Sequence, residues 1–143
     1  MKLHHSAIRV PDLATSIPWY CDYFKLKPTW SVDRLNHVTT GRLPGIEAIA
    51  ELGNRYLKLH LLHCPQTGDA VRGHVAFQHI CLQVKKLDDI AAMRERWLAL
   101  YNSNNYRFAL PEQPSEIVVE EDGSRNFYFL DIHGNEFELA YVA

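Results

Sequence analysis

The chain has 143 residues, enough for one compact domain with a buried core. A formal net charge of −2 gives no electrostatic argument for nucleic acid or an anionic membrane as a partner. No run approaches the roughly 18 apolar residues of a membrane span, and the first residues lack the apolar core of a signal peptide. The three cysteines form no CxxC motif and leave one unpaired, which favours free thiols. We therefore expect a cytoplasmic protein with no nucleic acid and no membrane as partner.

Alternation of polar and apolar residues predicts a first strand over Leu3–Val10. Pro11 ends this strand, and Asp12 is suited to cap a helix from about Leu13 to Phe24. The apolar residues of this helix recur at helical spacing, so they are expected to form its buried stripe. The expected stripe consists of Ile17, Tyr20, Cys21 and Phe24.

The rest of the first half contains three expected strands. A short one is predicted at Pro28–Val32, and the polar segment Leu35–Pro44 is expected to be an irregular, mobile loop. Gly53-Asn54 is a strong signal for a tight hairpin turn. It should join strands over Ile46–Leu52 and Tyr56–His63.

The second half begins after a linker rich in turn formers, at about residues 65–74. A strand over Val75–Val84 and a helix over Leu87 to about Asn102 should follow. Four further strands or strand-like segments complete the prediction. They are a weak strand near Tyr106–Leu110, an extended segment at Glu116–Glu120, and a closing hairpin of Arg125–Leu130 and Glu136–Val142 around the turn Asp131–Asn135.

The two halves repeat one pattern. His5-Ser-Ala-Ile-Arg-Val10 is echoed by His79-Ile-Cys-Leu-Gln-Val84, and each stretch leads into a helix. Self-similarity at about half the chain length indicates two copies of one unit. Each half then has the element order βαβββ, so we predict an α+β fold of two tandem modules in a single domain. Module 1 is placed at about residues 1–64 and module 2 at about residues 75–143.

Strand alternation places the ionisable side chains of four strands on the sheet face that points away from the helices. These side chains are His5, His60, His79 and Glu138. Several buried ionisable groups on one face would be costly without compensation. A divalent cation resolves this, because it holds neutral imidazoles and a carboxylate together. His60 is the least defined of the four, since its hairpin does not determine its height in the sheet and Glu51 competes for its role.

Ordinary structural explanations suffice for the remaining candidates. Cys81 is expected to be a small buried residue rather than a nucleophile, because no base is assigned beside it. The other histidines are expected to have only backbone or solvent partners. They are His4, His37, His63 and His74.

Three separated segments resemble the vicinal oxygen chelate superfamily, the group of glyoxalases, bleomycin resistance proteins and extradiol dioxygenases. LHHSAIRVPDLATSIPWYCDYFKL resembles the opening of its first module, QHICLQVKKLDDI that of its second, and NFYFLDIHGNEFEL its closing hairpin. The resemblance implies paired βαβββ modules forming a cupped mixed sheet, with helices on the outer face and commonly a second subunit. Ile132 departs from the proline that is usual in the closing turn, whereas Gly134 is kept.

The resemblance also implies that His5, His79 and Glu138 bind one divalent metal, with His60 near the fourth ligand position. Glyoxalase I and related enzymes have a glutamate at that position, so His60 is a departure. Two histidines and a glutamate with an open position suit Zn, Ni, Fe or Mn. Such a metal coordinates two oxygens of a small-molecule substrate and stabilises an enolate or oxyanion.

A metal-dependent lyase or isomerase of glyoxalase type is the leading functional prediction, and a homodimer is its expected assembly. Arg9 resembles the arginine with which glyoxalase I holds a carboxylate, so the substrate is expected to be anionic. Glu138, or Glu51, could be the general base, and Tyr128 and Lys58 are candidates for positioning the substrate.

Three other classes remain open. One is thiol transfer of fosfomycin type, for which the sequence has no clear potassium-loop or phosphonate-clamp pattern. An extradiol ring-cleaving dioxygenase would use the same His5, His79 and Glu138 set with Fe(II). The further histidine of that class before the closing hairpin is missing from Ile117–Arg125. A drug-binding resistance protein of bleomycin type would be no enzyme, and such proteins usually lack the metal ligands that are retained here.

Overall fold

The structure is a computed structural model that describes residues 4–66, 80–120 and 122–143. The chain divides into two compact units, Met1–Asp69 and Ala70–Ala143. Most of the predicted linker, and the strand predicted over Val75–Val84 up to residue 79, lie outside the described residues. No helix of the described residues is long and apolar enough to cross a membrane.

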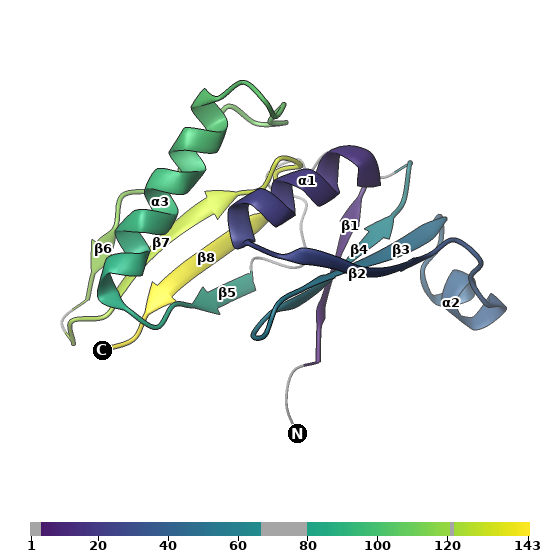
Figure 1. Cartoon of the computed structure of the whole chain (residues 1–143), viewed down its shortest axis with the longest axis horizontal. Coiled ribbons are helices and arrows are strands. Elements are labelled where there is room, and N and C mark those ends of the chain that lie inside the picture. The colour runs from purple at the N-terminus through teal and green to yellow at the C-terminus, as the bar shows by residue number, and fades with distance from the viewer. Residues whose placement is uncertain (1–3, 67–79, 121) are drawn as a thin grey trace. The chain divides into compact units, whose positions relative to one another are not determined.

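Unit 1 is a four-stranded mixed sheet with two helices (Figure 1). The strand order is β1-β4-β3-β2, in which β1 and β4 are parallel and the other neighbours antiparallel. Its elements are β1 (Ser6–Val10), α1 (Leu13–Phe24), β2 (Lys27–Val32), α2 (His37–Arg42), β3 (Ala48–Gly53) and β4 (Lys58–His63).

Unit 2 repeats this arrangement with the order β5-β8-β7-β6, and again its first and last strands are parallel. Its elements are β5 (Ile80–Gln83), α3 (Leu87–Asn102), β6 (Val118–Val119), β7 (Arg125–Leu130) and β8 (Glu136–Tyr141). The predicted α+β fold of tandem βαβββ modules is therefore confirmed.

The cores lie where each helix covers its own sheet. Helix α1 contacts β3 and β4, and α3 contacts β7 and β8. Alternate strand residues face the helix, so Leu59 and Leu61 are fully buried whereas Lys58 is exposed. In unit 2 the ring nitrogen of Trp97 donates a 2.8 Å hydrogen bond to the carbonyl of Leu130, which ties α3 to the end of β7.

Helix α1 begins and ends where the sequence predicts. The carboxylate of Asp12 accepts hydrogen bonds from the backbone N–H groups of Ala14 and Thr15, which are among the unpaired donors of the first turn. Its most buried side chains differ in part from the predicted stripe. Trp19 and Tyr23 are fully buried, while Ile17 and Cys21 are only partly buried. The stripe is rotated because the larger aromatic rings remove more apolar surface from water.

The expectation of an irregular loop at Leu35–Pro44 was wrong, because His37–Arg42 form a helix. Asn36 caps the short helix α2 by accepting the backbone N–H of Thr39. Leu35 and Leu43 pack against a small cluster on the sheet face opposite α1, which holds this segment on the sheet. The buried members of the cluster are Ile46, Leu62 and Cys64.

The weak strand predicted at Tyr106–Leu110 was also wrong. Phe108 lies 4.9 Å from the rings of both Trp97 and Tyr101, so this segment packs on α3. The second strand of unit 2 is β6 instead, within the predicted segment Glu116–Glu120.

Both hairpins form, with one difference. The turn between β3 and β4 spans Asn54–Leu57 rather than two residues, and the Asn54 side chain accepts the N–H groups of Tyr56 and Leu57. In the closing turn Asp131 accepts from the N–H groups of His133 and Asn135. Gly134 there has a φ of 88°, a conformation that glycine adopts without steric cost.

Candidate metal and substrate site

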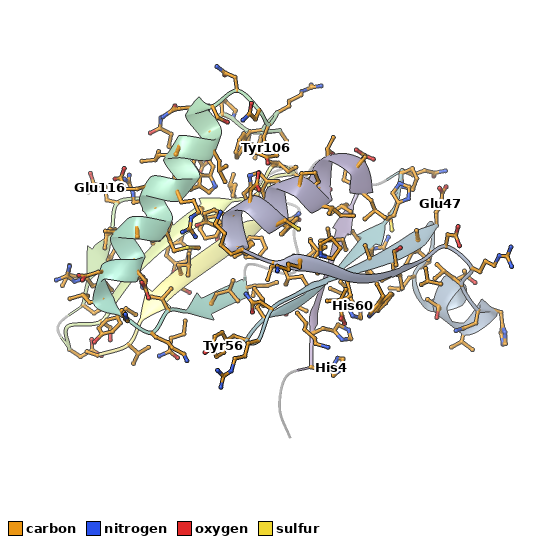
Figure 2. All side chains as sticks on the ribbon, viewed as in Figure 1. His4, Glu47, Tyr56, His60, Tyr106 and Glu116 are labelled. Atoms are coloured by element: carbon orange, nitrogen blue, oxygen red, sulfur yellow. The ribbon has the colours of Figure 1, made fainter. Side chains whose placement is uncertain are left out.

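Each sheet has one face packed on its helix and one face that carries polar side chains, as the alternation predicts. In unit 1 that second face carries His5, Arg9 and His60, while Ile8 and Val10 point into the core. Figure 2 shows His60 on the side of the sheet away from α1. We call this the polar face of unit 1.

A row of side chains crosses the polar face of unit 1 at one height. Trp30 on β2, Glu51 on β3, His60 on β4 and Ala7 on β1 are successive cross-strand neighbours. Directly opposed residues in a sheet bring their side chains within contact distance. The strand register therefore places Glu51 beside His60, which spacing along the sequence alone does not.

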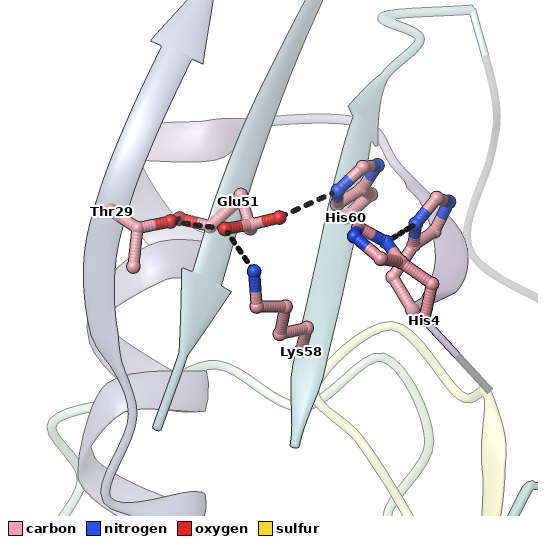
Figure 3. A network of polar contacts seen from close by, with 6 residues as sticks. His4, Thr29, Glu51, Lys58 and His60 are labelled. Carbon is pink, nitrogen blue, oxygen red and sulfur yellow. Dashed lines mark hydrogen bonds and ion pairs between the residues drawn. The ribbon is translucent and has the colours of Figure 1, made fainter. Parts of the chain in front are cut away.

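Glu51 is the centre of this row (Figure 3). Its Oε2 lies 3.0 Å from Nε2 of His60, and its Oε1 accepts a 2.6 Å hydrogen bond from the hydroxyl of Thr29. Nζ of Lys58 lies 3.6 Å from the same Oε1. These hydrogen bonds, the one from Thr29 first, lower the pKa of Glu51 to about 2, although the residue is only 4% exposed.

Histidine rings form the other end of the row. The rings of His5 and His60 are stacked, with 3.7 Å between centroids, and Nδ1 of His4 lies 2.9 Å from Nδ1 of His5. Desolvation of the His5 ring, together with the charges of His60 and His4, lowers the pKa of His5. A lowered pKa favours the neutral imidazole, which is the form that binds metals.

Arg9 lies further along the same face of β1. Its Nη1 donates a 3.1 Å hydrogen bond to the carbonyl of Pro44, in the segment that follows α2. The guanidinium has several other N–H groups, so this bond does not exhaust its donors.

Unit 2 has a second row at matching register positions. Cys81 on β5, Glu138 on β8 and Tyr128 on β7 are successive cross-strand neighbours, as Ala7, His60 and Glu51 are in unit 1. Desolvation, then the charge of Glu138 and a hydrogen bond with it, raises the pKa of Cys81 to about 11, even though the residue is exposed overall. The expectation that Cys81 would be a buried residue was therefore wrong.

Tyr128 flanks the other side of Glu138. Desolvation and the charge of Glu138 raise the pKa of Tyr128, so its phenol stays protonated near neutral pH. Glu138 thus lies between two proton donors on its own sheet.

The structure brings together only part of the predicted ligand set. His5 and His60 are in contact, Glu138 belongs to unit 2, and His79 lies outside the described residues. Within the residues that the structure describes, no group of three or more histidine, cysteine or acidic side chains could hold a metal by itself. As a donor set, imidazoles and a carboxylate suit a divalent first-row metal.

Sequence reasoning missed Thr29 and Trp30 and left the role of Glu51 open. A signal for Glu51 was present, because it is the one charged residue of the otherwise apolar stretch Ala48–Leu52. Trp30, which is 41% exposed, packs edge-on against His60 with 5.1 Å between ring centroids. Nothing in the sequence pattern pointed to that contact.

Comparison with protein families matches residues 2–139 to the Glyoxalase/Bleomycin resistance protein/Dioxygenase superfamily. The chain belongs to this superfamily. A search of curated protein sequences gave no match.

Solved structures of the glyoxalase superfamily share the fold. A glyoxylase/bleomycin resistance protein/dioxygenase domain from Frankia sp. EAN1pec has a TM-score of 0.72 at 16% identity, covering 100% of this chain and 93% of that one. Lactoylglutathione lyase from Agrobacterium tumefaciens has a TM-score of 0.62 at 19% identity, covering 99% and 94%. The fosfomycin resistance protein FosX from Listeria monocytogenes, complexed with Mn(II) and sulfate ion, has a TM-score of 0.61 at 20% identity, covering 99% and 93%.

Proposed function

We propose that the chain is a metal-dependent enzyme of glyoxalase type, a lyase or isomerase that acts on a small anionic substrate. The proposed ligands are His5, His60, His79 and Glu138, which bind one Zn, Ni, Fe or Mn ion. The observation that gives this the most support is that His60 and Glu138 have matching register positions. Each lies on the last strand of its unit, in the middle of a row of side chains that crosses the sheet. Two such rows give the superfamily's duplicated fold a donor set suited to a cation.

A cation bound by these residues supplies a Lewis acid where negative charge develops on the substrate. Arg9 is proposed to bind the anionic group, because it lies on the polar face of unit 1 with N–H groups beyond the one given to Pro44. Tyr128 is proposed to donate a hydrogen bond to a substrate oxygen, which its raised pKa permits. Glu138 is proposed to accept the substrate proton as general base.

The first test is metal content. We expect purified protein, reconstituted with metal and then desalted, to retain about one divalent ion per chain in elemental analysis. The reason is that several ligands positioned by the folded chain bind a metal tightly. His79→Ala should retain much less, and His37→Ala on the exposed start of α2 is the matched control. Equal metal in wild type and His79→Ala would contradict the proposed site.

The second test is a substrate screen of the metal-loaded protein with a hemithioacetal, a catechol and an epoxide. The proposal expects turnover of the hemithioacetal. Ring cleavage of the catechol with Fe(II) would replace the proposed lyase or isomerase function with a dioxygenase function, and turnover of the epoxide would point to the chemistry of fosfomycin resistance.

A third test concerns the assembly. The mass in light scattering should be twice the 16.5 kDa of one chain, because we propose a homodimer.

A further inference from the structure

We propose that Glu51 is a positioning residue that holds His60 as the tautomer with hydrogen on Nε2, so that Nδ1 is the nitrogen His60 offers to a ligand. The tautomer follows from contacts within unit 1 alone. Only the last step, that Nδ1 binds the metal, rests on the proposed function.

The contact between Glu51 and His60 decides which ring nitrogen carries the proton. Oε2 of Glu51 lies 3.0 Å from Nε2 of His60. An ionised carboxylate only accepts hydrogen bonds, and a neutral imidazole has one N–H and one lone pair. A hydrogen bond across this distance therefore requires the hydrogen on Nε2 and leaves the lone pair on Nδ1.

The other oxygen of Glu51 is held in place from the opposite side. Thr29 donates to Oε1 at 2.6 Å, and the ammonium group of Lys58 lies 3.6 Å from that oxygen. Glu51 is only 4% exposed, so water competes little for the carboxylate. With Oε1 bonded to Thr29 and paired with the ammonium group of Lys58, and Oε2 bonded to His60, Glu51 is suited to orient a neighbour rather than to bind a cation or take a substrate proton.

The ring of His60 is also held between aromatic neighbours. His5 stacks on it with an interplanar angle of 12°, and Trp30 packs edge-on at 77°. These contacts, with the hydrogen bond, restrict rotation of the ring. Figure 3 shows one ring nitrogen of His60 facing Glu51 and the other turned away from it. At metal sites, a carboxylate that accepts the N–H of a metal-binding histidine orients the ring in the same way.

The test is long-range ¹H–¹⁵N NMR of the histidine rings in metal-free protein, well above the ordinary imidazole pKa of about 6.5. The chain has 8 histidines, so H60N identifies the His60 signals. We expect hydrogen on Nε2 in wild type. In E51Q the amide oxygen should stay with Thr29 and Lys58 and its NH₂ should face His60, so the hydrogen is expected to move to Nδ1.

The matched control is E47Q, the same change at an exposed glutamate of the same hairpin, which should keep the wild-type tautomer. Hydrogen on Nδ1 in wild type would overturn the proposal without any variant, even if E51Q failed to fold. An unchanged tautomer in folded E51Q would overturn it as well.

Addition of Zn²⁺ to the same samples separates this proposal from the proposed function. We expect the Nδ1 signal of His60 to change on binding in wild type. Bound metal that leaves Nδ1 unchanged would remove the ligand step of the proposal, whereas absence of any bound metal would contradict the proposed function and leave the tautomer result standing.

Discussion

His60 and Glu138 occupy matching backbone positions but have opposite chemical surroundings. His60 faces the carboxylate of Glu51, whereas Glu138 faces the thiol of Cys81 and the phenol of Tyr128. In each unit the residues beside the proposed ligand complement its hydrogen bonding: an acceptor lies next to the imidazole of His60, and donors lie next to the carboxylate of Glu138. Neighbouring strands supply these partners, so the strand register sets the chemistry of each ligand.

The thiol of Cys81 provides a measurement at the scale of one residue. A pKa of about 11 leaves little thiolate near pH 8, so alkylation by iodoacetamide should be slow although the residue is exposed. Glu138→Gln removes the charge that contributes to the shift, and each unit of pKa changes the thiolate fraction about tenfold. We therefore expect Cys81 to be alkylated severalfold faster in this variant.

The rates are measured by peptide mass spectrometry on metal-free protein. Cys21 is the internal control, because its raised pKa comes from desolvation and Asp22 and should not respond to Glu138. Equal rates at Cys81 in both proteins would show that Glu138 does not influence the thiol.

At the scale of elements, the start of α1 is determined by one side chain. Asp12 accepts the backbone N–H groups of Ala14 and Thr15. A hydrogen bond with the side chain of Thr15 first, and then these two backbone hydrogen bonds, lower the pKa of Asp12. Asp12→Ala should lower the free energy of unfolding by about 1 kcal/mol at neutral pH, as loss of an N-cap does. Urea unfolding measures this change.

The cost of Asp12→Ala should depend on pH in a defined direction. A carboxyl with a lowered pKa in the folded state stabilises above its ordinary value of about 3.9, and this stabilisation is lost as pH falls through the folded-state pKa. The difference between wild type and variant should therefore shrink below about pH 4. Asp33→Ala, in an exposed bend, is the control and should change stability by less than about 0.5 kcal/mol. A difference that grows in acid would contradict the capping role.

At the scale of the whole molecule, the repeated unit explains both the element order and the two polar rows. Each unit buries its own core under its own helix, and each leaves one sheet face for polar residues. A cation bound by the proposed ligands would bind the folded chain and not the unfolded one. Its binding should therefore stabilise the folded state.

Thermal unfolding tests this stabilisation. At a free metal concentration of about 100 times the Kd, the folded state gains about 2.7 kcal/mol. This corresponds to a rise in Tm of roughly 5 to 10 °C for a domain of this size. We expect that rise in wild type and in His37→Ala but not in His79→Ala. A Tm of the wild type that does not change on addition of divalent metal would contradict the proposed site.

The sequence alone determined the features that depend on local pattern. Helical periodicity and the Asp12 cap set the bounds of α1, and strand alternation assigned the faces of β1, β4 and β8. The internal repeat and the family motifs then predicted the tandem fold. These features need only residues close together in the chain, where geometry has a fixed period.

Only the tertiary structure decided the pairing of Glu51 with His60 and the packing of α2 on the sheet. The pairing depends on the length of the Asn54–Leu57 turn, because a shift of one residue would move every side chain to the other face. Helix α2 is short, and its position depends on contacts of Leu35 and Leu43 with a cluster that includes Leu62 and Cys64, which lie far away in the sequence. Spacing along the sequence does not predict this strand register or this packing, because both arise only when segments that are separate in the chain come into contact.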